Sequence, residues 1–172
     1  MKLLISLCFS IFILSANDLA DIKTFQASFK QYITNSSSKV ITYNGDIYIK
    51  QPSLIFWQYN NPIEKNVYIT NQNVTIIEPD LEQAIISNLE KEINLLKLLK
   101  DAKHISNNIY KSNLYSRDYI LTIENNILNS IEYSDELDNK VKISFFNIKQ
   151  NQNINENIFK FIIPYEYDII RK

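Results

Sequence analysis

Few side chains in this sequence could act as catalysts. His104 is the chain's one histidine, so a Ser-His-Asp triad or a zinc site would have to use it. With one glycine in the chain, a Gly-x-Ser-x-Gly nucleophile turn cannot occur. Asp80 with Glu82, or Glu132 with Asp135, could form the carboxylate pair of a glycosidase, but positions in turns and on strand faces explain them equally well. We therefore expect that the protein is not an enzyme and that it binds no metal ion and no cofactor.

Composition also argues against binding of nucleotides or nucleic acids. The 18 basic and 19 acidic residues give a net charge of −1, and the basic residues are spread along the chain. Close approach of the backbone to phosphate usually needs glycines, and this chain has one. A length of 172 residues with 45% hydrophobic residues suits one globular domain with a substantial core.

The N-terminus has the features of an export signal. Lys2 provides a basic start, residues 3–14 form a short apolar stretch, and Leu-Ser-Ala completes a cleavage site. A transmembrane helix needs about 20 apolar residues, and polar residues follow too soon here, although an uncleaved anchor is the alternative. We predict that residues 1–16 are a cleaved signal peptide and that residues 17–172 form a single mature domain.

Cys8 does not mark a lipoprotein signal. It lies inside the apolar stretch and follows Leu7 rather than a small residue. Because it is the one cysteine, the mature chain is expected to be held by packing alone, without disulfides.

Short strands dominate the mature chain, after a short helix predicted at residues 18–23. Apolar and polar residues alternate in FQASFKQYI, residues 25–33, which is typical of a strand with one buried face. Turns rich in Asn separate the following segments, as in an antiparallel meander that curls toward a barrel. Further strands are predicted at residues 39–50, 54–59, 66–70, 74–78, 81–87, 118–124, 127–134, 140–148 and 158–170.

The hairpin at residues 45–62, GDIYIKQPSLIFWQYNNP, is apolar on both faces. Gly45 is predicted to form a bulge or to allow a close approach of another group. Leu54 and Phe56 point to one face. The other face carries Ile47, Ile49, Ile55, Trp57 and Tyr59. A small domain needs one core, so the second face must be covered by something else.

A helix is predicted at residues 88–105, and it too is apolar on two sides. Leu89, Ile93, Leu96 and Leu99 share one side, whereas Leu95, Leu98 and Ala102 lie opposite. Such a helix is either buried under the sheet or placed between a core and a ligand space. His104 would be a cap or a surface residue at the end of this helix.

These elements predict a single α+β domain with helices gathered on one face of an antiparallel sheet. A curved sheet with a helix across its mouth could enclose an apolar cavity, and plain core is the alternative for each apolar stripe.

Five motifs resemble the LolA family of periplasmic outer-membrane lipoprotein carriers in order and spacing. They are FQASFKQ (25–31), GDIYIKQP (45–52), LIFWQYNNP (54–62), EPDLEQ (78–83) and FKFIIP (159–164). The resemblance covers the mature chain, although residues 104–157 align loosely and no functional residue is carried across there.

The resemblance implies an incomplete antiparallel β-barrel with helices forming a lid over a hydrophobic cavity. It implies a periplasmic, monomeric chaperone that accepts acylated lipoproteins from the inner-membrane LolCDE transporter and delivers them to the outer membrane, in many species through LolB. Alternatives are a carrier of another lipid or glycolipid on the same fold, a ligand-free structural β-protein, and an unrecognised hydrolase.

The candidate site follows from the alternation of side chains between the two faces of each strand, together with the resemblance. The acyl-chain cavity would be lined by Phe25, Phe29, Ile47, Ile49, Ile55, Trp57 and Tyr59, and the lid would contribute Leu95, Leu96 and Leu99. The family usually has Arg before the proline matched to Pro52, where it is thought to tie barrel to lid. Here Gln51 holds that position, so lid closure is expected to use Lys50 or another contact, or to be looser.

Overall fold

The computed structural model describes residues 22–88 and 95–172. The predicted signal peptide and most of the predicted helix at residues 18–23 lie outside this part of the chain. Ile22 and Lys23, the last two residues of that predicted helix, are not helical but lead directly into the first strand.

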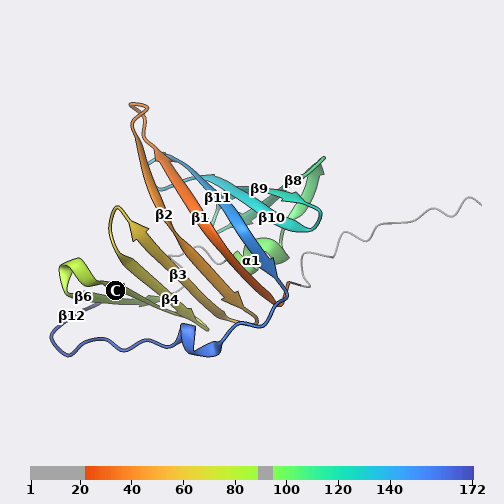
Figure 1. Cartoon of the computed structure of the whole chain (residues 1–172). Helices are drawn as coiled ribbons and strands as arrows, with labels where there is room; N and C mark the ends of the chain where they lie inside the picture. The colour runs from red at the N-terminus through yellow and green to blue at the C-terminus, as the bar shows by residue number, and fades with distance from the viewer. Residues whose placement is uncertain (1–21, 89–94) are drawn as a thin grey trace, which may run out of the picture.

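The described chain forms one 12-stranded sheet (Figure 1). Its order is β12-β6-β5-β4-β3-β2-β1-β11-β10-β9-β8-β7, and neighbours are antiparallel except for the parallel pair of β12 with β6. The strands are β1 (Thr24–Thr34), β2 (Val40–Lys50), β3 (Leu54–Asn61), β4 (Lys65–Thr70), β5 (Asn73–Glu78), β6 (Gln83–Asn88), β7 (Lys103–Ser106), β8 (Ile109–Leu114), β9 (Arg117–Glu124), β10 (Ile127–Ser134), β11 (Lys140–Gln150) and β12 (Asp168–Arg171).

The sheet is strongly curved and does not close, because β12 and β7 form its two edges and do not pair with each other (Figure 1). The prediction of an open, curved antiparallel sheet is therefore confirmed. Asn occupies many of the turn positions with positive φ that a glycine-poor chain must fill with other residues. Asn71, Asn107, Asn125, Asn126, Asn147 and Asn151 all have positive φ.

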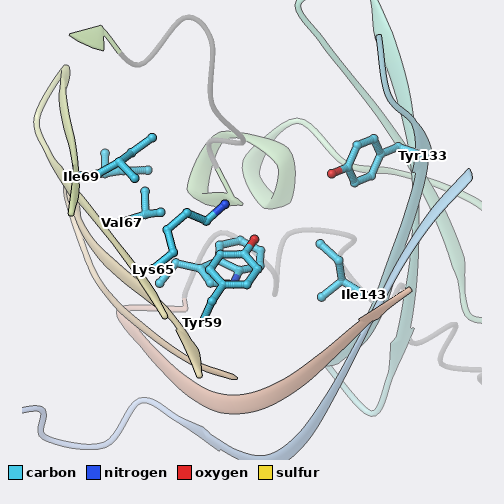
Figure 2. Close-up of a pocket in the computed structure, with 8 residues that line it drawn as sticks. Tyr59, Lys65, Val67, Ile69, Tyr133 and Ile143 are labelled. Carbon is cyan, nitrogen blue, oxygen red and sulfur yellow. The ribbon is translucent and has the colours of Figure 1, made fainter. Parts of the chain in front are cut away.

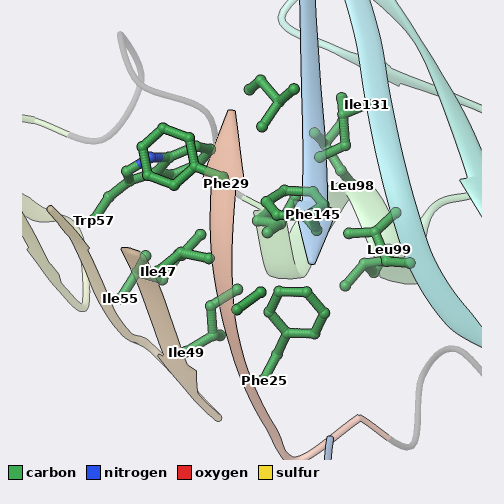
Figure 3. Close-up of a cluster of buried hydrophobic side chains, with 14 of the residues drawn as sticks. Phe25, Phe29, Ile47, Ile49, Ile55, Trp57, Leu98, Leu99, Ile131 and Phe145 are labelled. Carbon is green, nitrogen blue, oxygen red and sulfur yellow. The ribbon is translucent and has the colours of Figure 1, made fainter. Parts of the chain in front are cut away.

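The main hydrophobic core lies on the concave side of the sheet. Helix α1 (Leu95–Lys100) is on this side, and it buries Leu95, Leu98 and Leu99 in the same cluster. Figure 3 shows side chains from the β1–β3 half of the sheet meeting Ile131 and Phe145 from the opposite half. The two halves are thus held together by packing across the concave face.

The predicted helix at residues 88–105 was wrong at both ends. Asn88 belongs to β6, and residues 103–106 form β7, which pairs with β8. Residues 89–94 lie outside the described part, so the described helix has six residues. Pairing with β8 satisfies the backbone of residues 103–106, and this non-local contact overrides the local helical pattern. None of the helices among the described residues has the length and apolarity needed to cross a membrane.

The closing segment also differs from the prediction of a strand over residues 158–170. A 3₁₀ helix, η4 (Glu156–Phe159), and irregular chain come first, and the strand β12 begins only at Asp168. Figure 1 shows this segment running along the outside of the sheet before it reaches β12 at the far edge. A chain that crosses over the strands cannot pair with them along its length.

The outer course of this segment explains why the hairpin is apolar on both faces. On the convex side, Phe56, Ile154 and Phe159 form a second buried cluster. The rings of Phe56 and Tyr68 stack with their centroids 4.5 Å apart. The centroid of the Tyr68 ring lies 4.7 Å from that of Phe161 in the closing segment. The C-terminal segment therefore covers the face that bears Leu54 and Phe56, and the opposite face forms the concave core.

Gly45 lies at a bulge, as predicted, and other chain atoms approach its backbone too closely to leave room for a side chain. The pairing of β2 with β3 shifts register between Asn44 and Gly45. A β-carbon at Gly45 would lie 1.8 Å from the carbonyl oxygen of Gln58 and 2.7 Å from the ring of Phe29. Only glycine fits at this point.

Candidate functional site

A cavity of about 80 Å³ opens on the concave side, where the two halves of the curved sheet face each other. Strands β3, β4 and β5 form one wall, and β10 and β11 supply residues to the other (Figure 2). The lining residues are Trp57, Tyr59, Lys65, Val67, Ile69, Ile76, Tyr133 and Ile143.

Strand register explains why one wall is apolar. Trp57 pairs with Val67, and Val67 pairs with Ile76, so these side chains form one row across β3, β4 and β5. Tyr59 pairs with Lys65 in the next row. Because residues paired across strands point to the same face, each row presents its side chains to the cavity together.

Polar groups lie among these apolar side chains. Trp57 is 6% exposed, and its indole nitrogen Nε1 is buried with no hydrogen-bond acceptor in the described part of the chain. The amine of Lys65 lies 4.4 Å from the centroid of the Tyr59 ring, a cation–π contact. The ring of Tyr59 stacks on that of Trp57, with the ring centroids 6.2 Å apart. The cavity is therefore a largely apolar space with one cation beside it, and the indole nitrogen of Trp57 is buried out of its reach.

The predicted cavity residues separate into two groups. Trp57 and Tyr59 line the cavity. The other five, Phe25, Phe29, Ile47, Ile49 and Ile55, are buried in the main cluster next to it (Figure 3). Of the predicted lid residues, Leu95 and Leu99 are buried in this cluster and Leu96 is partly buried against it.

Sequence reasoning missed six of the lining residues. Alternation within residues 66–70 and 74–78 already placed Val67, Ile69 and Ile76 on a common face with apolar neighbours, so those three could have been found. Tyr133 and Ile143 come from the other half of the sheet, and only the curvature brings them near Trp57. Lys65 is the first residue of β4 but precedes the strand predicted at residues 66–70, and as a charged residue it does not add to the apolar pattern.

Gln51 contacts the segment that leads into β1. Its side-chain Nε2 donates a hydrogen bond to the carbonyl oxygen of Ile22 at 2.8 Å, and its backbone N–H donates to that of Lys23 at 2.8 Å. Lys50 instead forms an ion pair with Glu156 in η4, on the convex side. The hydrogen bonds of Gln51 therefore fix the chain just before β1, and Lys50 contacts the C-terminal segment.

Two of the polar residues considered for catalysis, His104 and Glu132, make contacts within or between strands. His104 lies in the exposed strand β7, not at a helix end as predicted, and its Nε2 is 2.7 Å from the carbonyl oxygen of Asn107. Glu132 pairs with Lys142 at 2.8 Å across the outside of the sheet. Among the described residues, no cluster of His, Cys, Asp and Glu could hold a metal ion.

A second apolar hollow, of about 460 Å³, lies on the convex side between the sheet and the C-terminal segment. We call it the convex groove. Burial raises the pKa of Tyr68, one of its walls. Its lining residues are Asn66, Tyr68, Ile77, Lys160, Phe161, Ile162, Pro164 and Tyr167.

Comparison with known proteins identifies the family. The model of the family described as outer membrane lipoprotein carrier protein LolA matches residues 20–162. The chain belongs to the LolA family. An outer-membrane lipoprotein carrier protein of Wolinella succinogenes is 36% identical over 152 residues, which cover 88% of each chain. The protein of the same name from Campylobacter jejuni is 36% identical over 167 residues, covering 96% of this chain and 97% of that one.

Solved structures agree with the LolA fold. A LolA superfamily protein from Nitrosomonas europaea matches with a TM-score of 0.54 at 8% identity, covering 84% of this chain and 94% of that one. A conserved protein from Thermus thermophilus matches with a TM-score of 0.56 at 13% identity, covering 91% and 94%. At such low identity these matches bear on the fold alone.

Proposed function

We propose that this LolA-family lipoprotein carrier holds the acyl chains of its cargo on the concave face of the sheet, starting at the cavity beside Trp57. The observation that carries the proposal is this cavity, in which apolar rows from β3–β5 face Tyr133 and Ile143 across the sheet. Burying one methylene group is worth about 0.8 kcal/mol, so several long acyl chains exposed to water would cost on the order of tens of kcal/mol. A carrier must therefore cover them.

Binding whole acyl chains requires the concave side to open. The cavity of about 80 Å³ is smaller than typical ligand pockets of about 300–1,000 Å³. We infer that α1 acts as a lid, which would move Leu95, Leu96 and Leu99 away from the main cluster. Leu95, Leu98 and Leu99 of α1 are buried in the main cluster, so moving the lid would expose apolar surface that the acyl chains could cover in turn.

The remaining predicted cavity residues would become lining in the open state. Phe25, Phe29, Ile47, Ile49 and Ile55 belong to the concave cluster that includes the α1 leucines, so displacement of α1 would expose this surface to the cargo. Gln51 would hold the chain before β1 in place while the lid moves.

The family also supports a location and partners. We place the mature domain, residues 17–172, in the periplasm after removal of a signal peptide at residues 1–16. It would act as a monomer, receive lipoproteins from LolCDE at the inner membrane and pass them to a LolB-type acceptor or directly to the outer membrane. No nucleotide or catalytic group of this chain would take part, and transfer would run down a gradient of affinity between carriers.

Native mass spectrometry of the mature protein tests this proposal. The protein is mixed with a diacylated lipoprotein in detergent, and in parallel with the same lipoprotein after removal of its acyl chains. We expect a one-to-one complex that survives detergent removal and depends on the acyl chains. Uptake of phospholipid or glycolipid without lipoprotein would instead indicate a carrier of another lipid, and a complex that forms without acyl chains would contradict the proposal.

A further inference from the structure

Strand β12 is an open edge of the sheet. It is the last strand in the sheet order, and no strand of the described residues lies beyond it (Figure 1). All four of its residues are exposed, including Ile169 at 50% and Ile170 at 38%. An edge strand with outward backbone groups and exposed apolar side chains is a template for a further strand.

The hydrogen bonds of β12 show which of its backbone groups face outward. The N–H groups of Asp168 and Lys172 donate to carbonyl oxygens in and just before β6, at 2.9 and 3.0 Å. Successive residues of a strand direct their N–H and C=O groups to opposite sides, so Ile170 also faces β6. Ile169 and Arg171 therefore direct their N–H and C=O groups to the open edge.

These outward groups and the charges of β12 suit pairing with a second copy of the same strand. When a strand pairs antiparallel with its own copy, a two-fold axis relates the two and one residue lies opposite itself. With Ile170 at this centre, Ile169 of each copy lies opposite Arg171 of the other, and their outward backbone groups meet as hydrogen-bonded pairs. Asp168 of each copy then lies opposite Lys172 of the other, which brings opposite charges together. A centre at Ile169 would lose this charge pairing, and a centre at Arg171 would oppose two arginines.

The same centre lies at the end of an apolar row. Ile76, which lines the concave cavity, pairs with Ile85, and Ile85 pairs with Ile170. Because paired residues point to the same face, Ile170 extends the row from the cavity to the open edge. In a two-fold pair the rows of both copies meet at Ile170, with the two Cα atoms about 4.5 Å apart. The chain's net charge of −1 opposes this approach little.

From these observations we propose that β12 is a self-association edge, which pairs antiparallel with β12 of a second copy and is centred on Ile170. The pair is closed, because each copy uses the same edge. The contact is small, since β12 has four residues and a stable interface buries about 800 Å² on each partner. The pair is therefore weak, and the monomer proposed as the carrier predominates in dilute protein.

Cysteine cross-linking tests the register. The one cysteine, Cys8, lies in the predicted signal peptide, so a mature single-cysteine variant cross-links only through the introduced thiol. Ile170→Cys places two thiols opposite each other, with a Cα separation of about 4.5 Å that suits a disulfide. Ile169→Cys, at a more exposed position of the same strand, is the matched control, because in this register its two copies lie too far apart to bond.

Under mild oxidation, Ile170→Cys should form a covalent dimer at least about tenfold faster than Ile169→Cys, because pairing raises the local thiol concentration. Equal rates, or a faster reaction of Ile169→Cys, would overturn the proposed register.

Charge exchange tests the contact without a covalent bond. Sedimentation velocity over a range of concentrations measures the self-association of the mature protein. Asp168→Lys and Lys172→Asp each place like charges opposite one another and should weaken self-association at least about fivefold. The double variant restores opposite charges and should associate like wild type. Both positions are exposed, so circular dichroism should not change. Absence of self-association in wild type, or equal association in all four proteins, would overturn the inference.

The pairing does not depend on the proposed function, and the two can fail separately. Amide hydrogen exchange at Ile169 and Arg171 should slow as the protein concentration rises, with no lipoprotein present. Protection that appears only after lipoprotein is added would assign the edge to the cargo's polypeptide. That result would overturn the pairing and leave the carrier function standing.

Discussion

Phe56 and Trp57 are consecutive residues of β3, yet they belong to different hydrophobic clusters on opposite sides of the sheet. Trp57 packs in the concave core and lines the cavity, whereas Phe56 is covered by the C-terminal segment. Alternation along a strand gives the two residues opposite directions. The two-sided hairpin therefore does not indicate surplus apolar surface, because one side has a structural cover and the other carries the candidate binding site.

Removing the ring of Phe56 should weaken the fold without removing lipoprotein binding. We expect Phe56→Ala to lower the free energy of unfolding by about 3–5 kcal/mol, because it opens a cavity in the second cluster. Urea denaturation measures this loss. Hydrogen exchange should speed up at Ile158 and Lys160, whose amides close the turns of η4. Loss of lipoprotein binding under conditions where the variant is folded would contradict the assignment of Phe56 to a purely structural role.

A side chain at Gly45 should be poorly tolerated. Gly45→Ala places a β-carbon against the carbonyl oxygen of Gln58 and the ring of Phe29, so β2 and β3 must separate. We expect a loss of about 3 kcal/mol or more in urea denaturation. Thr42→Ala, at an exposed position in the same strand, is the control and should change stability by less than about 1 kcal/mol. Equal losses in the two variants would show that the close approach at Gly45 is relieved at little cost.

A charge in the cavity should prevent cargo binding. Ile76 lines the cavity and is partly buried, so Ile76→Glu would place a carboxylate where acyl chains are expected to lie. We expect binding of a diacylated lipoprotein to weaken at least about tenfold while circular dichroism stays unchanged. Ile162→Glu, at a position 90% exposed on the convex side, should bind normally. Wild-type affinity in a folded Ile76→Glu variant would exclude this wall as the binding surface.

Two hairpin turns provide a matched test of pH dependence. Asn35 Oδ1 accepts hydrogen bonds from the backbone of Ser37 and Lys39, and Asp135 Oδ1 accepts the equivalent pair from Leu137 and Asn139. Although desolvation opposes ionisation, the hydrogen bonds from Asn139 and Leu137 and the charge of Arg117 hold the pKa of Asp135 below its usual value.

Stability should therefore fall with acid through Asp135 but not through Asn35. A carboxyl whose folded pKa is depressed stabilises the fold above its unfolded pKa of about 3.9, and that contribution is lost as the pH falls through the folded pKa. Asp135→Asn should be less stable than wild type at neutral pH, and the difference should shrink below about pH 4. Asn35→Asp should gain the same kind of dependence. Urea midpoints measured at several pH values test this prediction. Parallel curves of midpoint against pH for wild type and Asp135→Asn would refute it.

The half of the fold made by local hairpins could be predicted from the sequence. Alternation and Asn-rich turns mark β1 to β5, where each strand pairs with its sequence neighbour. Strands β7 to β11 also pair with their sequence neighbours, but two pairings of the sheet join residues far apart in the chain. β1 pairs with β11, and β6 with β12, so neither local pattern nor turn chemistry reveals these pairs.

The candidate site follows the same division. Trp57 and Tyr59 could be selected because they share one face of a strand, but Phe25 and Ile49 share that face too and lie in the packed core. Alternation along a strand predicts which face of the sheet a side chain points to. It does not predict whether that side chain packs in the core or lines a cavity. Lys65 could be assigned to the site only after the cavity beside it was defined.

Photocrosslinking from the two apolar hollows tests most directly where the acyl chains lie. Tyr133 lines the concave cavity and Tyr68 lines the convex groove. Each is replaced in turn by the photoreactive p-benzoylphenylalanine, and the complex with a diacylated lipoprotein is irradiated and analysed by mass spectrometry. Binding on the concave face predicts crosslinks to the acyl chains from position 133 and none from position 68. Crosslinks from position 68 alone would contradict it and would place the acyl chains on the convex side.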